Sequence, residues 1–301
     1  MTERMEYHKP ALLAESLAQL AIKPNGVYVD VTFGGGGHSR GILEKLEKGR
    51  LFAFDKDEDA AVNRLDDSRF ELIRSDFKFI EIELSKRGIT QVDGILADLG
   101  ISSHQIDDPQ RGFSYRFDAD LDLRMDNRED FSAADLLNTW EEFELMKVFR
   151  NYGEIDNARR LAKAIVRARI EKTISTTFEL ETAIADILPK EKARYLSKLY
   201  QALRIAVNDE LRGLKTLLES GLRLLAPGGR FAVISYHSLE DRIVKNFFRF
   251  GNLEGNDDRD IFGNSLSHLK VITRHAIAPS DLEIKNNPRS RSAKLRAAEK
   301  R

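Results

Sequence analysis

Four consecutive glycines at residues 34–37 lie between an apolar run, residues 27–31, and a segment with helical character that begins at His38. Glycine has no Cβ, so such a loop can reverse tightly and let a ligand approach the backbone. A second apolar run, residues 51–54, is followed directly by Asp55. In a β-α-β unit a carboxylate at this position accepts hydrogen bonds from ribose hydroxyls. The pattern predicts an adenosine-containing cofactor at the carboxyl edge of a parallel sheet.

The spacing of these glycines argues against two phosphate-binding motifs. A dinucleotide fingerprint needs a third glycine where this chain has Ser39 or Arg40, and a P-loop needs Gly-Lys-Ser or Gly-Lys-Thr where this chain continues into His38. S-adenosylmethionine carries no phosphate and needs room only for its ribose and methionyl parts. We therefore favour S-adenosylmethionine as the cofactor, with a glycine-rich connection that binds nothing as the alternative.

Three further residues follow expected strands and could do chemistry at the same edge. Asp55 is either a ribose ligand or a turn residue, and Phe77 either packs on the cofactor through its ring or belongs to the core. Asp98 ends an apolar run, where a carboxylate is poorly solvated unless it has a partner. An amino group to be methylated, or the cofactor's ammonium, would be such a partner. Asp98 is therefore our candidate catalytic residue, with a capping role as the alternative.

The elements that must position these residues alternate between apolar runs and helical segments. This alternation predicts an α/β fold with a Rossmann-like parallel sheet. A long, mostly helical stretch then separates the fourth strand from the fifth, which predicts one α/β domain in two parts, residues 1–105 and 207–301, with a helical subdomain inserted at residues 106–206. The expected strands are residues 27–31, 51–54, 71–74, 94–97, 230–235 and 271–277.

Two finer expectations concern the second half of the chain. Apolar positions from Val207 to Leu225 recur at helical spacing, which predicts one long helix that ends before residues 226–229, Ala-Pro-Gly-Gly. Residues 251–260 and the extreme carboxyl end lack such periodicity, and we expect them to be the least ordered stretches.

The composition limits the class of protein. The 301 residues carry a formal net charge of −1, so a nucleic-acid-binding surface would have to be a local basic patch. The chain contains no cysteine, which excludes disulfides, thiolate catalysis and cysteine-ligated zinc. The charged start and the lack of a long apolar run predict no signal peptide and no membrane span. We expect a soluble, cytoplasmic protein without membrane contact.

Residues 118–129 have an acidic spacing similar to that of a calcium-binding loop. Asp118, Asp120, Asp122 and Glu129 fit it, but Leu123 stands where the sharp turn needs glycine. We therefore expect no metal. The arginines among these acids predict an internal charge network instead: Arg111, Arg116 and Arg124.

Two basic stretches could contact an RNA backbone, although a charge run is often only a solvated face. The first lies on an expected helix and contains Arg159, Arg160, Lys163, Arg167, Arg169 and Lys172. The second is the carboxyl-terminal tail, residues 285–301, with Lys285, Arg289, Arg291, Lys294, Arg296, Lys300 and Arg301.

Several segments together resemble the MraW/RsmH family of S-adenosylmethionine-dependent 16S ribosomal RNA cytosine-N4 methyltransferases. They occur in the expected order along nearly the whole chain: residues 8–13 (HKPALL), 30–39 (DVTFGGGGHS), 98–103 (DLGISS), 111–114 (RGFS), 121–125 (LDLRM), 201–208 (QALRIAVN), 235–242 (SYHSLEDR) and 287–292 (NPRSRS). Residues 251–269 match the family weakly, so their contacts stay open.

The resemblance implies a helical substrate-recognition insert and a cytidine of the small-subunit decoding centre as substrate. It also implies a set of residues that line the cofactor site: Gly36, Gly37, His38, Asp55, Phe77, Asp98 and Gln105. The expected partner is 16S rRNA within the small ribosomal subunit. The sequence leaves the oligomeric state open, with a homodimer among the alternatives.

The expected reaction is direct methyl transfer to the exocyclic amine of a cytosine that has left its stack. Tyr236 and His237 follow the fifth strand and are candidates to hold the base, whereas Arg204, Asn208 and the tail arginines Arg289 and Arg291 are candidates to hold the RNA backbone. The rival interpretations are a nicotinamide-dependent oxidoreductase, a methyltransferase that acts on DNA or a small molecule, and an RNA-binding assembly factor without catalytic activity.

Overall fold

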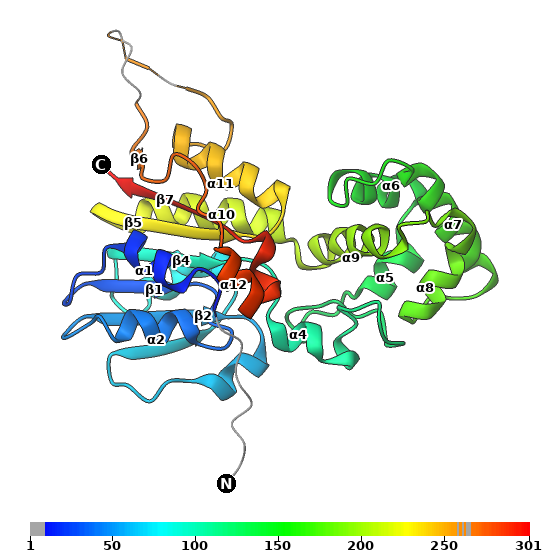
Figure 1. Cartoon of the computed structure of the whole chain (residues 1–301), viewed down its shortest axis with the longest axis horizontal. Coiled ribbons are helices and arrows are strands. Elements are labelled where there is room, and N and C mark those ends of the chain that lie inside the picture. Colours follow the sequence, from blue (N-terminus) through cyan, green and yellow to red (C-terminus); the bar gives the residue numbers. More distant parts are fainter. Residues whose placement is uncertain (1–9, 258, 261, 263–265) are drawn as a thin grey trace. The chain divides into compact units, whose positions relative to one another are not determined.

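The structure, a computed structural model, describes residues 10–257, 259–260, 262 and 266–301 (Figure 1). His8 and Lys9, part of the first family-like segment, lie outside the described residues. The chain forms two compact units: the first takes the residues up to Gly100 and those from Arg212 onward, and the second is Ile101–Leu211. The predicted insertion, residues 106–206, falls within the second unit.

The first unit is an α/β fold built on a seven-stranded sheet in the order β3-β2-β1-β4-β5-β7-β6. Strands β1 to β5 are parallel, and β7 runs antiparallel to its neighbours β5 and β6. The chain order reverses at β1, which pairs with β2 on one side and β4 on the other. The strands are β1 (Val27–Asp30), β2 (Arg50–Asp55), β3 (Phe70–Arg74), β4 (Val92–Asp98), β5 (Leu225–Ser235), β6 (Leu269–Val271) and β7 (Lys294–Lys300).

Helices cover both faces of this sheet, so its central strands are continuously apolar, as parallel strands buried on both faces must be. Successive residues of a strand point to opposite faces: Tyr28 packs with α1 (Leu13–Leu20) and α2 (Gly37–Leu43), and Val29 packs with the other helices. Those other helices are α3 (Ile80–Ser85), α10 (Glu210–Leu224) and α11 (Ser238–Phe250). A short helix, α12 (Asp281–Asn286), and a turn of 3₁₀ helix, Pro288–Ser292, precede β7.

The second unit is helical and has its own apolar core, which includes Leu136, Phe149, Leu161 and Leu199. Its helices are α4 (Ser103–Asp107), α5 (Ala133–Thr139), α6 (Glu142–Asn151), α7 (Ala158–Glu171), α8 (Thr177–Ala183) and α9 (Lys192–Asn208). No helix among the described residues of either unit is both long and apolar enough to cross a lipid bilayer.

The acidic loop of the second unit is tied down by arginines, in agreement with the predicted charge network. Arg124 Nε lies 2.6 Å from Asp122 Oδ1, and Arg111 Nη2 donates to the carbonyl of Arg124 at 3.0 Å. Arg116 is exposed. The ion pair between Arg124 and Asp122 therefore stabilises this loop from within.

Three predictions about the second half of the chain are wrong in detail. The long helix is interrupted at Asp209, whose φ of +50° is left-handed, so Val207 belongs to α9 and not to α10. The sixth strand is shorter and earlier than residues 271–277, and Ile277 makes only an isolated bridge to Leu295. The carboxyl end is not loosely ordered, because residues 294–300 form β7 inside the sheet.

Because β7 is part of the sheet, its buried residues should contribute to the stability of the fold. A disordered basic tail would not contribute in this way. Leu295 is fully buried between Ile234 of β5 and the rest of the core, so Leu295→Ala should lower the free energy of unfolding by about 2–5 kcal/mol. Arg291 is exposed, and Arg291→Ala should change it by less than about 0.5 kcal/mol. Chemical denaturation of both variants measures this, and an unchanged stability of Leu295→Ala would contradict the assignment of β7.

Candidate active site

Three acidic residues of the first unit lie at the carboxyl ends of neighbouring strands: Asp30 ends β1, Asp55 ends β2 and Asp98 ends β4. Because β1 pairs with β2 on one side and with β4 on the other, this edge is the point where the strand order reverses. Open α/β sheets bind ligands at such a point. The topology therefore brings the predicted Asp55 and Asp98 to one sheet edge.

Asp55 holds the start of the glycine loop. Its Oδ2 accepts a hydrogen bond from Gly34 N at 2.8 Å, and its Oδ1 accepts one from Asp57 N at 2.9 Å. Burial raises the pKa of Asp55 to about 6, although these two N–H groups act to lower it. A carboxylate has about four acceptor positions, so two remain for the hydroxyls of a ribose.

The glycine loop favours glycine for two different reasons, a left-handed backbone at Gly34 and Gly36 and a close contact at Gly37. Gly36 has a φ of +73°, a left-handed conformation that favours glycine. A Cβ on Gly37 would lie 2.8 Å from Pro10 Cγ, so only glycine lets the amino-terminal segment pack this closely. At Gly34 a Cβ would meet nothing within 4 Å. The loop is thus packed against the protein at Gly37 and borders open space at Gly34.

His38, the first residue after the four glycines, is buried with both ring nitrogens facing protein atoms. Its Nε2 lies 3.0 Å from the carbonyl oxygen of Ala11, and its Nδ1 lies 3.6 Å from Asp98 Oδ2. Only 5% of its side chain is exposed, against 21% for Asp98. The imidazole is therefore inside the protein, and Asp98 is the member of this pair that a ligand can reach.

Asp98 is held by groups from two neighbouring strands. Its backbone N–H donates to Thr32 Oγ1 at 2.6 Å, and its Oδ1 accepts from the hydroxyl of Tyr236 at 2.8 Å. Burial raises the pKa of Asp98 to about 6, while the facing His38 and the Tyr236 hydrogen bond act to lower it. Burial and the Asp98 carboxyl also raise the pKa of Tyr236, so its phenol stays a neutral donor.

Asp30 is the residue of this cluster that the sequence interpretation missed as a functional group. It is fully buried, its Oδ2 accepts from Ser39 Oγ at 2.7 Å, and its Oδ1 accepts from Thr32 N at 3.2 Å. Burial raises its pKa, against the opposing effects of His38 and these donors. The sequence did contain a signal for Asp30, because this acid ends an apolar strand shortly before the glycine loop.

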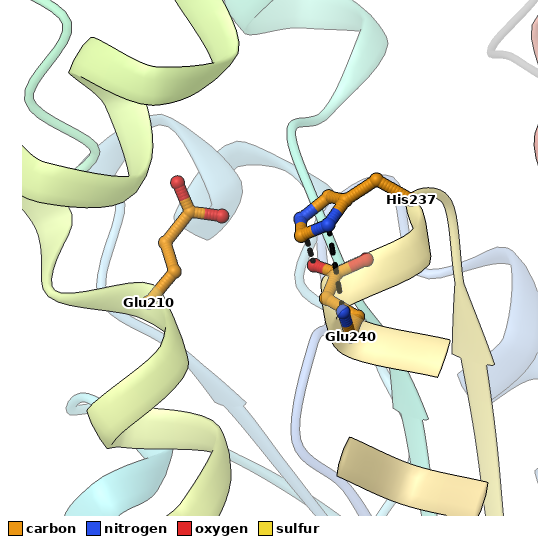
Figure 2. Close-up of side chains that lie close together, drawn as sticks. All are labelled: Glu210, His237 and Glu240. Atoms are coloured by element: carbon orange, nitrogen blue, oxygen red, sulfur yellow. Dashed lines mark hydrogen bonds and ion pairs between the residues drawn. The ribbon is translucent and has the colours of Figure 1, made fainter. Parts of the chain in front are cut away.

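Tyr236 and His237 lie after β5, where α11 begins. His237 is the N-terminal cap of α11: its Nδ1 accepts from Glu240 N at 3.4 Å, and its Nε2 lies 3.2 Å from Glu240 Oε1 (Figure 2). Glu240 Oε2 in turn accepts from Tyr236 N at 2.9 Å. These contacts orient both predicted substrate residues. Glu210, also drawn there, belongs to the second unit.

Comparison with known proteins decides the family. A family model described as the MraW methylase family matches residues 5–301. The chain belongs to this family. It is 54% identical over 302 residues to the ribosomal RNA small subunit methyltransferase H of Flavobacterium johnsoniae, with 100% of both chains covered, and 50% identical over 301 residues to that of Bacteroides thetaiotaomicron, with 99% of both covered.

Solved structures give a more distant likeness. An rRNA methylase from Streptococcus thermophilus is 13% identical with a TM-score of 0.41, and covers 95% of this chain and 92% of its own. This likeness is too distant to bear on function. The family membership instead rests on the match over the whole chain.

Two of the cofactor residues implied by this MraW-type sequence lie outside the carboxylate cluster. Phe77 is half-buried beside the core, and a Cβ on Gly213 of α10 would lie 3.4 Å from its ring. Gln105 belongs to the second unit, where it caps α4: its backbone N–H donates to Ser102 Oγ and its Oε1 accepts from Ser102 N. The ring of Phe77 and the side-chain amide of Gln105 therefore both make structural contacts in this protein.

Arg204 and Asn208, predicted to hold RNA, make contacts within the second unit. Arg204 Nε lies 2.8 Å from Glu210 Oε1, and Asn208 bonds to Met125 N and to the carbonyl of Leu123. These contacts explain both residues without RNA. Asn208 holds residues 121–125 in place, which is a structural role.

The basic residues of α7 divide into two groups. Arg169 donates to the carbonyls of Leu137 and Trp140, and Lys172, just past the helix, pairs with Glu179 at 2.6 Å. The remaining members of the predicted set are exposed and form what we call the basic face of α7: Arg159, Arg160, Lys163 and Arg167.

The tail arginines also divide. Arg289 and Arg291 are exposed in the 3₁₀ turn before β7. Within β7, Arg296 pairs with Asp241 at 2.7 Å, and Lys300 donates to the carbonyl of Arg223 at 3.2 Å. The last part of the predicted basic tail is therefore a strand, and Arg289 and Arg291 lie in the turn before it.

Burying Asp98 should reduce stability at neutral pH. A carboxyl with a raised pKa stabilises the fold below its unfolded pKa and loses that contribution as pH rises through its folded pKa, here about 6. Asp98→Asn should therefore raise the Tm more at about pH 7.5 than at about pH 4.5. Calorimetry at the two pH values measures the difference.

Asp93 is the matched control, because its pKa is lowered in the folded protein whereas the pKa of Asp98 is raised. Burial would raise its pKa, but hydrogen bonds from Lys23 Nζ and Val27 N outweigh this and hold the pKa below its usual value. Its contribution is present above the unfolded pKa and lost as pH falls. Asp93→Asn should lower the Tm, more at neutral than at acid pH. Equal shifts at both pH values for Asp98→Asn would contradict the account of its burial.

Proposed function

We propose that this protein transfers a methyl group from S-adenosylmethionine to the exocyclic N4 amine of a decoding-centre cytidine in 16S rRNA of the small ribosomal subunit. The observation that carries the proposal is the Asp98 carboxyl: it ends β4 at the switch point of the sheet, and a fifth of its side chain remains open to a ligand. The names of relatives at 50–54% identity over the full length support the rRNA substrate. We propose that the protein acts in the cytoplasm, because its proposed substrate is ribosomal.

The residues of the first unit fit the proposed cofactor. Asp55 keeps two acceptor positions for ribose hydroxyls, and the backbone at Gly34 borders open space where a ligand can lie. Phe77, just after β3, has a half-buried ring that is proposed to pack on the cofactor. When bound, S-adenosylmethionine supplies an electrophilic methyl group on a sulfonium. The proposed reaction needs no metal.

Asp98 has the chemistry that the amine requires. The nitrogen lone pair of the cytosine amine is delocalised into the ring, so the amine is a poor nucleophile. A carboxylate that accepts a hydrogen bond from N–H as the nitrogen becomes pyramidal stabilises the transition state and orients the amine. Tyr236 stays neutral and donates a hydrogen bond to Asp98 Oδ1, which fixes the carboxylate. The negative charge of Asp98 therefore remains available to the substrate.

Substrate recognition is divided between two residues that follow β5 and a set of exposed cations. We propose that the base, once out of its stack, is held by Tyr236 and His237, and that phosphates are bound by the basic face of α7 and by Arg289 and Arg291. Arg204 and Asn208 are left out of this proposal because their side chains are committed inside the second unit.

Methyl transfer to small subunits tests the reaction. Wild-type protein with labelled S-adenosylmethionine should label 16S rRNA of unmethylated small subunits, and nucleoside analysis should place the label on N4 of one cytidine. Asp98→Asn should lower the transfer rate by at least about 100-fold, because the amide keeps an acceptor oxygen but lacks the negative charge that stabilises the developing positive charge on the amine and cannot take up its proton. Its affinity for RNA should match the wild type. Label on DNA, on a small molecule or on no substrate would reject the proposed substrate.

The basic face of α7 predicts a specific salt dependence. Replacing two phosphate-binding cations, Arg159→Ala with Lys163→Ala, should weaken RNA binding and reduce the slope of log affinity against log salt by about 2. Lys86→Ala, on an exposed position of the first unit, is the matched control and should change the slope by less than about half a unit per charge removed. Fluorescence anisotropy over a salt series measures both. A slope unchanged in the double variant would remove α7 from the RNA interface.

A further inference from the structure

We infer that Asp98 and His38 act as one proton-accepting pair: Asp98 takes the proton that the amine loses on methylation, and His38 Nδ1 shares it. The inference rests on the proposed function, since it assigns the destination of the proton in that reaction. It goes further by giving a buried histidine next to the glycine loop a part in the chemistry rather than in cofactor contact.

The orientation of His38 follows from its Nε2 partner. A backbone carbonyl oxygen can only accept, so Nε2, at 3.0 Å from the Ala11 carbonyl, carries a hydrogen. The other ring nitrogen, Nδ1, is then a free base in the neutral imidazole, and it points to Asp98 Oδ2 at 3.6 Å. A lone pair and a carboxylate that face each other in a buried place repel unless a proton lies between them.

Asp98 divides its two oxygens between different partners. Oδ1 accepts from Tyr236 at 2.8 Å, and Oδ2 faces His38. At 3.6 Å this second contact is longer than a hydrogen bond. Catalytic hydrogen bonds are commonly long in ligand-free enzymes and shorten in the substrate complex. The pair thus lies at the distance from which a small side-chain rotation would form the bond.

The amino-terminal segment positions the Ala11 carbonyl. Leu12 is fully buried with a left-handed φ of +52°, and its N–H donates to Glu283 Oε1 at 2.8 Å. Pro10 packs on Gly37, the residue before His38. The carbonyl that selects the tautomer of His38 is therefore held from both sides, in the way that a backbone carbonyl orients a histidine at a metal site. Ala11 and Leu12 position His38; they do not touch substrate.

The step balances as follows in atoms and charge. The amine nitrogen forms a bond to the methyl carbon, the carbon–sulfur bond breaks, and its electron pair neutralises the sulfonium as a thioether. The nitrogen, now positively charged, loses its N–H proton to the Asp98 carboxylate. Transfer of that proton to Nδ1 leaves an imidazolium beside a carboxylate, and water takes the proton after the product leaves.

Several charged groups act on the pair and set the pH range in which it can accept. Asp30 and Glu240 raise the pKa of Asp98 beyond the effect of burial, and His38 lowers it, as does the hydrogen bond from Tyr236. Glu283 acts on Tyr236 in the same direction as Asp98. The pair must be deprotonated to accept, so the transfer rate should rise as pH passes the pKa of Asp98, which is about 6.

Two substitutions of His38 separate a proton acceptor from a structural side chain. His38→Gln keeps an N–H group near the Nε2 position, and His38→Asn keeps a hydrogen-bonding group near Nδ1, but neither amide can take up a proton. Both should lower the single-turnover rate by at least about tenfold and move the acid limb of its pH profile to higher pH, because His38 acts to lower the pKa of Asp98 and this effect is lost. The affinity for S-adenosylmethionine should stay within about twofold of the wild type. His268→Gln, at an exposed position, is the control and should change neither quantity.

A wild-type acid limb in either His38 variant would overturn the inference, as would recovery of the wild-type rate by His38→Asn. Nitrogen NMR of the wild-type chain tests the same point without a variant that must fold: in the neutral ring Nε2 should carry the hydrogen and Nδ1 should carry none. A hydrogen resident on Nδ1 of the neutral ring would also overturn it. Failure of the proposed function looks different, because wild-type protein would then not methylate 16S rRNA at all.

Discussion

The burial of a carboxyl group at the reversal point of the sheet is the constraint on which the site depends. Asp98 ends a strand whose preceding residues are fully buried, so its charge is costly there and its pKa is raised. The groups that offset this cost come from other segments: Thr32 after β1, His38 after the glycines and Tyr236 after β5. The proposed substrate amine would complete the set of donors. The site is thus stabilised most when it is occupied.

The glycine loop and Asp98 depend on each other through this arrangement. Gly37 must lack a Cβ for Pro10 to pack on it, and the segment that begins at Pro10 supplies the carbonyl that orients His38. Asp55 holds the other end of the loop through Gly34 N. One loop therefore links the expected ribose ligand to the proton-accepting pair.

Much of this was predictable from the sequence, because strong periodicity and sharp stops are local signals. The first five strands and the placing of Asp55 and Asp98 at strand ends follow from apolar runs that end in acids. The strand β7 did not, because its residues, Lys294–Lys300, alternate charge with small apolar side chains and its pairing with β5 is far away in sequence. The break at Asp209 was hidden because helical spacing continues across it.

The side-chain roles were harder to predict than the strands. Arg204 and Asn208 looked like RNA contacts in sequence, yet their partners Glu210 and Met125 are set by folding of the second unit. The same holds for Asp30 and His38, whose partners come from segments that only tertiary structure brings together. The type of residue at the end of a strand indicates which chemistry is possible there. The contacts that shift the pKa of that residue come from other segments and cannot be predicted from the local sequence.

The most direct test of the account is the structure of the protein in complex with S-adenosylhomocysteine and a cytidine. The account predicts the ribose hydroxyls on the Asp55 carboxylate and an Asp98 oxygen within about 2.6–3.2 Å of the cytosine N4. A cytosine whose amine points away from Asp98, or a cofactor ribose bound elsewhere than on Asp55, would contradict it.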